Sequence, residues 1–159
     1  RWLRLKTPYA IVPNGAFLPD LTPSLHGHAT IRFSYMGRFA IDHKGLDLLI
    51  RSFAVFYQAT RHGYLFLIGD GADTSRLRRL IAHYHLQHRV KIMPPRFRDD
   101  KAKALTETDI FVHTSRWDVL PTGCLDAAAH GKPLLVVPQT GLAPYVQKHR
   151  AGWVTNQAA

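Results

Sequence analysis

The stretch of sequence that decides the fold covers residues 109–137 and reads DIFVHTSRWDVLPTGCLDAAAHGKPLLVV. Each end of the stretch is apolar and rich in branched side chains, which is typical of a buried strand. The middle, 121–129, predicts a helix, because Pro121 suits a first helical turn and Gly131 suits the left-handed residue that closes a helix. Strand, helix and strand in succession form the unit of a parallel sheet with crossover helices.

The same alternation extends in both directions along the chain. Short β-branched or aromatic runs predict further strands, and apolar residues spaced by three and four, such as Leu46, Leu49 and Ile50, predict helices. The expected strands are 31–36, 64–68, 90–93, 109–113, 133–137 and 152–155. The expected helices begin near Lys44, cover 77–84, run from a cap at Asp99 or Asp100 to Leu105, and cover 121–129 and 142–148. We therefore predict a doubly wound, Rossmann-like α/β domain with a parallel sheet of about six strands over residues 31–159, preceded by a segment over residues 1–30 that leads into it.

Composition narrows the class of protein. Of 159 residues, 46% are hydrophobic and 20% are charged, which fits one globular domain, and no apolar run approaches the ~20 residues needed to span a bilayer. The single cysteine, Cys124, has no partner for an internal disulfide, so a reducing cytosol is the expected compartment. The chain begins at Arg1 rather than Met, and we expect it to be a piece of a longer protein.

The charge balance favours an anionic partner. Lys and Arg number 21 against 11 Asp and Glu, which gives a formal net charge of +10. Between Thr74 and Arg98 there is no acidic residue, and the basic residues there are Arg76, Arg78, Arg79, Arg89, Lys91, Arg96 and Arg98. Such a run is typical of a solvated face, and it also fits phosphorylated ligands, nucleic acid or an anionic membrane surface.

Several residues suited to an anion follow the ends of predicted strands. In an open parallel sheet, ligands bind beyond the carboxyl ends of the strands, where the strand order reverses. Gly37 and Arg38 follow the first strand, Lys44 comes shortly after them, and Gly71 follows the second strand. Glycine lets the backbone approach a ligand closely, and two cations near one site suit a diphosphate.

The start of the predicted helix in the deciding stretch adds backbone donors and two acids. The N–H groups of Thr122, Gly123 and Cys124 are expected to have no helical acceptor and to form an anion cradle. Asp126 lies on the second turn, from which its carboxylate leans back toward the same crevice, and Asp118 lies in the loop before the helix. Because carboxylates do not stabilise a phosphate, we expect them to accept protons from sugar hydroxyls at its two ends.

The order and spacing of these motifs resemble the C-terminal domain of glycosyltransferase family 4, whose members are retaining enzymes of the GT-B architecture. The matching motifs are Ile11-Val12-Pro13-Asn14-Gly15, Gly37-Arg38 followed by Lys44-Gly45, Gly69-Asp70-Gly71, Arg89-Val90, and the stretch from Asp118 to Gly131-Lys132-Pro133. The most specific element is the pair of acids eight positions apart. The resemblance implies the C-terminal half of a GT-B fold that takes a nucleoside diphosphate sugar as donor substrate, without a cofactor or a metal.

The resemblance also implies a role for each site residue. The catalytic set would be Arg38 and Lys44, which hold the donor diphosphate, and Asp118, which contacts the transferred sugar. The donor-binding set would be Gly37, Gly71, Thr122 and Gly123 near the phosphates, Asp126 on the ribose hydroxyls, and the region from Met93 to Arg96 near the nucleobase.

One departure from the family keeps more than one function open. The family usually carries Glu at both acidic positions, whereas Asp118 and Asp126 are each shorter by one methylene, ~1.5 Å. One reading is hexosyl transfer to a glycan or lipid-linked acceptor by a two-domain protein whose N-terminal acceptor domain is absent from this chain, so that the chain alone binds donor but scarcely turns over. The alternatives are a catalytically silent glycosyltransferase-like subunit and a basic nucleic-acid-binding protein. A lipid-linked acceptor would bring a cytoplasmic protein to the anionic inner face of a membrane.

Overall fold

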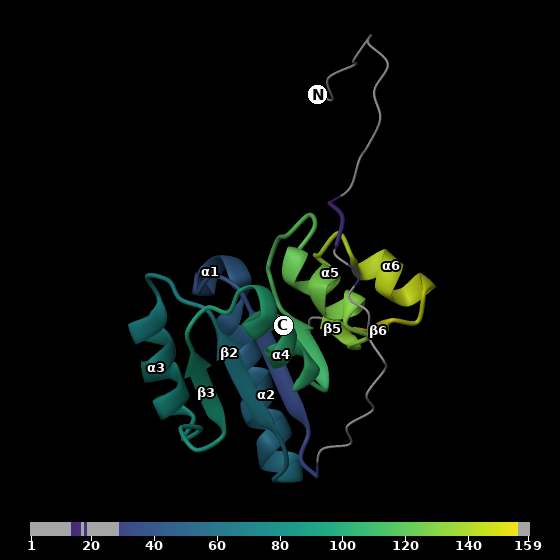
Figure 1. Cartoon of the computed structure of the whole chain (residues 1–159). Coiled ribbons are helices and arrows are strands. Elements are labelled where there is room, and N and C mark those ends of the chain that lie inside the picture. Colours follow the sequence, from purple (N-terminus) through teal and green to yellow (C-terminus); the bar gives the residue numbers. More distant parts are fainter. Residues whose placement is uncertain (1–13, 17, 19–28, 156–159) are drawn as a thin grey trace, which may run out of the picture.

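The computed structural model describes residues 14–16, 18 and 29–155, and in that part a parallel sheet carries helices on both faces (Figure 1). The segment expected over residues 1–30 lies almost wholly outside the described residues, as do residues 156–159.

Strands and helices alternate along the described chain, as the sequence predicts. The strands are β1 (Arg32–Met36), β2 (Tyr64–Ile68), β3 (Val90–Met93), β4 (Ile110–His113), β5 (Leu134–Val136) and β6 (Gly152–Val154). The helices are α1 (Ile41–Lys44), α2 (Leu46–Thr60), α3 (Thr74–His83), α4 (Arg98–Thr106), α5 (Thr122–Ala129) and α6 (Ala143–Lys148). Each expected strand is present, and no strand end differs from its expected position by more than one residue.

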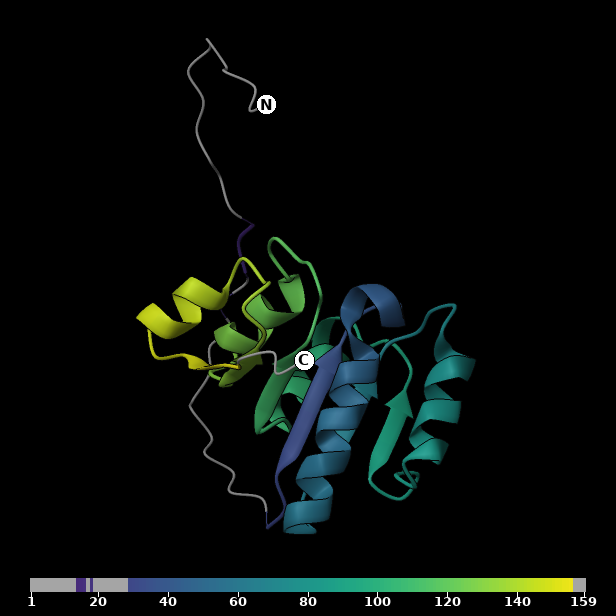
Figure 2. The same ribbon diagram turned by 180° about the vertical axis from the view of Figure 1, so that it is seen from behind.

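All neighbouring strands are parallel, in the order β3-β2-β1-β4-β5-β6. The chain builds outward from β1 to β3 and then returns to place β4 on the other side of β1, so the strand order reverses between β1 and β4. The helices of the two halves lie on opposite faces of the sheet, as right-handed crossovers require. In the view of Figure 2, α2 lies in front of the sheet. The predicted doubly wound, Rossmann-like α/β sheet of six strands is confirmed.

Two hydrophobic cores, one on each face, hold the sheet between its helices. The first joins α2 and α3 to the sheet and includes Ile50 and Leu77. The second joins α5 and α6 to the opposite face and includes Ala127. Successive residues of β4 show the division, since Phe111 belongs to the second core and Val112 to the first. Burial on both faces explains why these strands are continuous apolar runs.

Gly45 divides the helix that the sequence predicts near Lys44 into two. Helix α1 ends at Lys44 and α2 begins at Leu46, and Gly45 between them has φ 62° and ψ 33°. A Cβ at Gly45 would lie only 2.1 Å from Thr114 O, so a side chain does not fit this left-handed position. Thr114 Oγ1 donates to Lys44 O at 3.1 Å, which ties this turn to the segment that follows β4.

Two other helix starts also differ from the expectation. Pro121 does not occupy the first turn of α5: it precedes that helix with extended backbone at φ −69° and ψ 109°. Asp99 and Asp100 lie inside the first turn of α4 and make no capping hydrogen bond there, so their contribution is the favourable charge at a helix N-terminus. Gly131 has the predicted left-handed conformation after α5, with φ 68°.

Candidate functional site

A cavity of about 310 Å³ lies at the carboxyl ends of β1 and β4, where the strand order reverses. This is the position at which open parallel sheets bind ligands. Its walls come from β1 and the loop after it, the end of α1, the end of β4 and the start of α5. The lining residues are Tyr35, Met36, Gly37, Arg38, Lys44, His113, Asp118, Leu120, Pro121, Thr122 and Gly123.

Six of the site residues that the sequence predicts line this one cavity. They are Gly37, Arg38, Lys44, Asp118, Thr122 and Gly123. They come from three separate parts of the chain, so their approach to one another is a property of the fold. The arrangement gathers two cations, two backbone N–H groups and one carboxylate around a space of molecular size.

The other four predicted residues do not line the cavity. Met93 ends β3, where its carbonyl accepts the N–H of Gly69 at 3.0 Å. Arg96 lies 3.8 Å from Asp100, one turn further along the chain. Gly71 packs against the backbone of Phe39, with a Cβ there only 2.4 Å from the Phe39 carbonyl oxygen.

Asp126, the fourth of these residues, is engaged elsewhere. Its carboxylate forms an ion pair with Lys101 of α4, and both side chains are about 30% exposed, at 32% for Lys101 and 28% for Asp126. The expectation that Asp126 reaches back into the same crevice as Asp118 is therefore not met in this structure. Lys101, in a solvated helix segment, has no sequence signal that marks it as a partner of Asp126.

The N-terminus of α5 presents two free backbone donors instead of the three expected. Among the described residues, the N–H groups of Thr122 and Gly123 donate to no acceptor, whereas Cys124 N–H donates to Pro121 O at 3.0 Å. A tight first turn uses that third donor. A Cβ at Gly123 would lie 3.1 Å from Met36 O, so glycine lets α5 approach the end of β1 closely. The helix N-terminus thus opens into the cavity with partial positive charge.

Asp118 and Lys44 form an ion pair inside the cavity. Lys44 Nζ lies 2.6 Å from Asp118 Oδ2, and the side chains are 17% and 15% exposed. The backbone of Asp118 is also held, because its carbonyl accepts the N–H of Gly141 at 2.9 Å. The sequence predicts an anionic ligand for Lys44, and this ion pair with Asp118 was not expected from it.

The loop that carries Asp118 is fixed to α1 and α2 by its neighbours. Arg116 donates two hydrogen bonds to the carboxylate of Asp47, at 3.0 and 2.7 Å, and a third to the carbonyl of Ile41 at 3.1 Å. Burial opposes ionisation of Asp47, but the hydrogen bonds and charge of Arg116 hold its pKa below its usual value. Trp117 stacks on His43, with ring centroids 4.7 Å apart. These contacts position Asp118 over the cavity.

His113 is a residue of this cavity that was not predicted from the sequence. It ends β4, its side chain is 5% exposed, and Nε2 lies 3.3 Å from Asp118 Oδ2. Burial lowers the pKa of His113 to about 4, so the ring is neutral at pH 7. The sequence does contain one indication of this role, because His113 is a polar residue at the carboxyl end of an apolar strand, where parallel sheets bind ligands.

Cys124 is not a nucleophile of this site. Its side chain is wholly buried in the second core, and burial raises the pKa of the thiol far above its ordinary value. A thiol that stays protonated at neutral pH does not attack.

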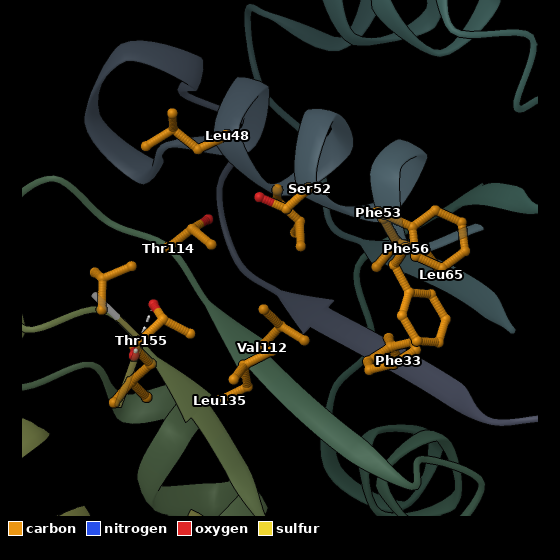
Figure 3. A pocket seen from close by; sticks show the side chains of 13 residues that line it. Phe33, Leu48, Ser52, Phe53, Phe56, Leu65, Val112, Thr114, Leu135 and Thr155 are labelled. Carbon is orange, nitrogen blue, oxygen red and sulfur yellow. Dashed lines mark hydrogen bonds between the residues drawn. The ribbon is translucent and has the colours of Figure 1, made fainter. Parts of the chain in front are cut away.

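A larger cavity lies on the face of the sheet that α2 covers, and its lining has a different chemistry. It measures about 370 Å³, and Figure 3 shows apolar side chains of α2 and of neighbouring strands around it, including Phe53, Phe56, Val112 and Leu135. Ser52, Thr114 and Thr155 supply the polar atoms of its lining, and no charged side chain lines it. Of these two cavities, the smaller one therefore holds the cationic side chains, Arg38 and Lys44.

The fold and the smaller cavity define a class: a Rossmann-like domain with a cavity lined by Arg38 and Lys44 at the switch point of its sheet. The sequence model of the glycosyl transferases group 1 family matches residues 24–158, and the chain belongs to that family. The chain is also 34% identical over 109 residues to YqgM of Bacillus subtilis (strain 168), an uncharacterized glycosyltransferase, with 69% of this chain and 30% of that protein covered. The chain therefore spans less than a third of that relative's length.

Solved structures share the fold. A mutant of S. aureus TarM, in complex with Fondaparinux, alpha-GlcNAc-glycerol and UDP, superposes with a TM-score of 0.78 at 15% identity, over 91% of this chain and 29% of TarM. Anabaena HepE, in complex with UDP and glucose, superposes with a TM-score of 0.66 at 25% identity, over 80% of this chain and 34% of HepE. The resemblance to GT-B glycosyltransferases is confirmed for the family and the fold.

Two further features are absent from the described residues. None of the helices in residues 29–155 is long and apolar enough to cross a membrane. In the same part of the chain, His, Cys, Asp and Glu side chains do not gather in threes as metal ligands would.

Proposed function

We propose that this chain is the donor-binding domain of a retaining glycosyltransferase of family 4, the C-terminal half of a two-domain GT-B enzyme. The donor would be a nucleoside diphosphate sugar, and a hexose would pass to a glycan or lipid-linked acceptor. One observation carries the proposal: Arg38, Lys44 and the N-terminus of α5 converge on one cavity at the switch point of the sheet. A diphosphate is the common ligand group that matches this set of donors and charges.

The diphosphate would lie between the two cations and the helix. Arg38 can donate two parallel hydrogen bonds to phosphate oxygens, and Lys44 adds a point charge. The N–H groups of Thr122 and Gly123 would bind the opposite side. As the bond to the sugar breaks, negative charge grows on the leaving diphosphate, and these groups neutralise it where other enzymes use a metal ion. The proposed transfer therefore needs no metal.

Asp118 would bind the transferred sugar. Its carboxylate lines the cavity on the side of the loop, where it can accept a proton from a sugar hydroxyl. Asp126 would bind the ribose hydroxyls, and to do so it must exchange or share its contact with Lys101. The nucleobase would lie near Met93 and Arg96. HepE, which is 25% identical to this chain, was solved with UDP and glucose, and this supports UDP as a candidate donor nucleotide.

The acceptor site would lie on an N-terminal domain outside this chain. We therefore expect the chain by itself to bind donor and to show little turnover. For a lipid-linked acceptor, the protein would work in the cytoplasm at the inner face of a membrane. The exposed residues Arg76, Arg78 and Arg79 of α3 are the candidates for contact with anionic lipid headgroups.

Calorimetry with UDP, GDP and ADP tests the proposal. The wild-type chain should bind at least one of them, and Arg38→Ala should weaken that binding by about ten- to hundredfold, since a charge-assisted hydrogen bond is removed. Arg78→Ala is the matched control, because it removes the same charge from an exposed position on α3. Failure of all three nucleotides to bind, or equal binding by Arg38→Ala, would contradict the assignment.

A second candidate function is a catalytically silent subunit that uses the fold to bind a partner. The observation that favours it is that both acids are already paired with lysines, Asp118 with Lys44 and Asp126 with Lys101. Asp118→Glu and Asp126→Glu in the full-length protein separate the two. A large rise in transfer indicates a degenerated site, and a fall indicates a site that works with Asp.

A further inference from the structure

His113 is the last residue of β4, and its ring nitrogen Nε2 lies close to the carboxylate of Asp118. Nε2 is fully buried and lies 3.3 Å from Asp118 Oδ2. Within the described residues, no hydrogen bond of good alignment reaches this nitrogen. A buried polar atom without an aligned partner costs stability, so packing alone does not account for it.

Asp118 presents its two oxygens differently. Oδ2 lies 2.6 Å from Lys44 Nζ and 3.3 Å from His113 Nε2, so it has two neighbours on the protein side. Among the described residues, hydrogen bonds to this carboxylate reach Oδ2 and not Oδ1. The carboxylate is therefore oriented, with one oxygen toward the protein and the other available to a ligand.

We propose that His113 is a positioning residue for Asp118. When Lys44 turns to the diphosphate of a donor, the Nε2–H group of His113 becomes the hydrogen-bond partner that holds Oδ2 and keeps Oδ1 directed at the sugar. The inference rests on the proposed function, because it takes the donor to be a sugar nucleotide. His113 lines the cavity, but its Nε2 is buried, so this nitrogen acts on Asp118 and does not contact the ligand.

The electrostatics around His113 agree with this role. Burial is the largest influence and lowers its pKa to about 4, Asp118 raises it, and Lys44 and His43 lower it. Tyr35 and Cys124 lie nearby, and burial keeps both protonated and uncharged at neutral pH. When Lys44 turns to the diphosphate, a positive charge moves away from His113. The contact between His113 Nε2 and Asp118 Oδ2 then becomes stronger, at the stage when Asp118 has lost its contact with Lys44.

Two substitutions separate positioning from packing. His113→Leu removes the donor and keeps an apolar volume, whereas His113→Gln places an amide N–H near the position of Nε2. Calorimetry would compare UDP, GDP and ADP with their glucose derivatives for each variant. We expect His113→Leu to lose about three- to tenfold in affinity for the glucose derivative, the effect of one hydrogen bond, with the parent diphosphate unaffected. His113→Gln should restore the wild-type affinities.

The outcomes distinguish the two proposals. Equal loss for both ligands, no loss for either, or failure of His113→Gln to restore binding would overturn the positioning role. Absence of wild-type binding to every nucleotide would instead overturn the proposed function. A ligand-free measurement stands beside these: nitrogen NMR of the imidazole should show a neutral ring protonated at Nε2 at pH 7. Protonation at Nδ1 would leave no donor toward Asp118 and would overturn the inference even if His113→Leu does not fold.

Discussion

Lys44 Nζ lies 2.6 Å from Asp118 Oδ2, although the two residues are 74 positions apart in the sequence. Their side chains are 17% and 15% exposed, so solvent screens the attraction little. The proposed function assigns these charges to different parts of the donor, the cation to the diphosphate and the carboxylate to the sugar. Donor binding must therefore compete with the ion pair.

Substitution of Lys44 separates its two roles. Lys44→Met should weaken nucleoside diphosphate binding by about ten- to hundredfold, because a charged donor is lost. It should also destabilise the fold by about 1–3 kcal/mol, because a largely buried carboxylate loses its counter-ion. Calorimetry and urea unfolding measure the two effects.

A double variant provides the control for Lys44. Lys44→Met combined with Asp118→Asn removes both charges, so it should recover most of the stability and none of the diphosphate affinity. Recovery of the affinity would show that Lys44 acts only as the partner of Asp118.

Gly45 should be intolerant of a side chain. Gly45→Ala places a Cβ 2.1 Å from Thr114 O at φ 62°, and we expect a loss of at least about 2 kcal/mol in unfolding free energy. Gly131→Ala is the matched control, since φ is 68° and no atom lies within 4 Å of the added Cβ. Its cost should stay near 1 kcal/mol, the strain of the left-handed conformation alone. Similar thermal unfolding of the two variants would contradict the clash.

Arg116 should support the site from outside the cavity. Arg116→Met breaks the bonds to Asp47 and should lower stability by about 1 kcal/mol or less, because the pair is partly exposed. Since the folded pKa of Asp47 is lowered, its contribution is present above the unfolded pKa of 3.8 and is lost as pH falls through the folded value. The stability difference between wild type and Arg116→Met should therefore shrink in acid to the part that comes from the hydrogen bond of Arg116 to Ile41 O. A difference that persists unchanged at pH 2 would rule out this electrostatic origin.

His113 should make the fold sensitive to mild acid. Its folded pKa of about 4 is below the unfolded value of 6.5, so the unfolded chain binds a proton first and stability falls as pH drops from 6.5 toward 4. At pH 5 this amounts to about 2 kcal/mol. His113→Gln lacks the titration, so its urea midpoint should change less than that of wild type between pH 8 and pH 5. Parallel changes in the two proteins would contradict a buried, neutral His113.

The fold could be predicted because its signals are local. Strand and helix periods, and the glycines and prolines that interrupt them, are properties of short windows, and every expected strand is present. The predicted boundaries are wrong at helix starts, such as Pro121, which precedes α5 instead of beginning it. Whether a helix begins at one residue or the next depends on the hydrogen bonds of its first turn. The division of the helix at Gly45 depends on its close contact with Thr114, which follows β4. These two residues are far apart in the sequence, so a short stretch of sequence does not contain both.

The candidate site could be predicted in part for a related reason. Arg38, Lys44, Asp118 and Gly123 all follow strand ends, and the parallel sheet brings those ends to one edge. The pairing of charges within the site could not be predicted in this way. It depends on side-chain directions in segments that meet only after folding, as with Lys101 and Asp126.

The amino-acid sequence by itself determined the order of strands and helices, the parallel sheet, and which residues stand where its strands end, because hydrophobic period and turn chemistry act over a few residues. The tertiary structure alone decided that Lys44 neutralises Asp118, that His113 is buried and neutral beside it, and that two N–H groups at the start of α5 have no acceptor among residues 14–16, 18 and 29–155. These depend on burial and on distances between chain segments, and electrostatic interactions change with both.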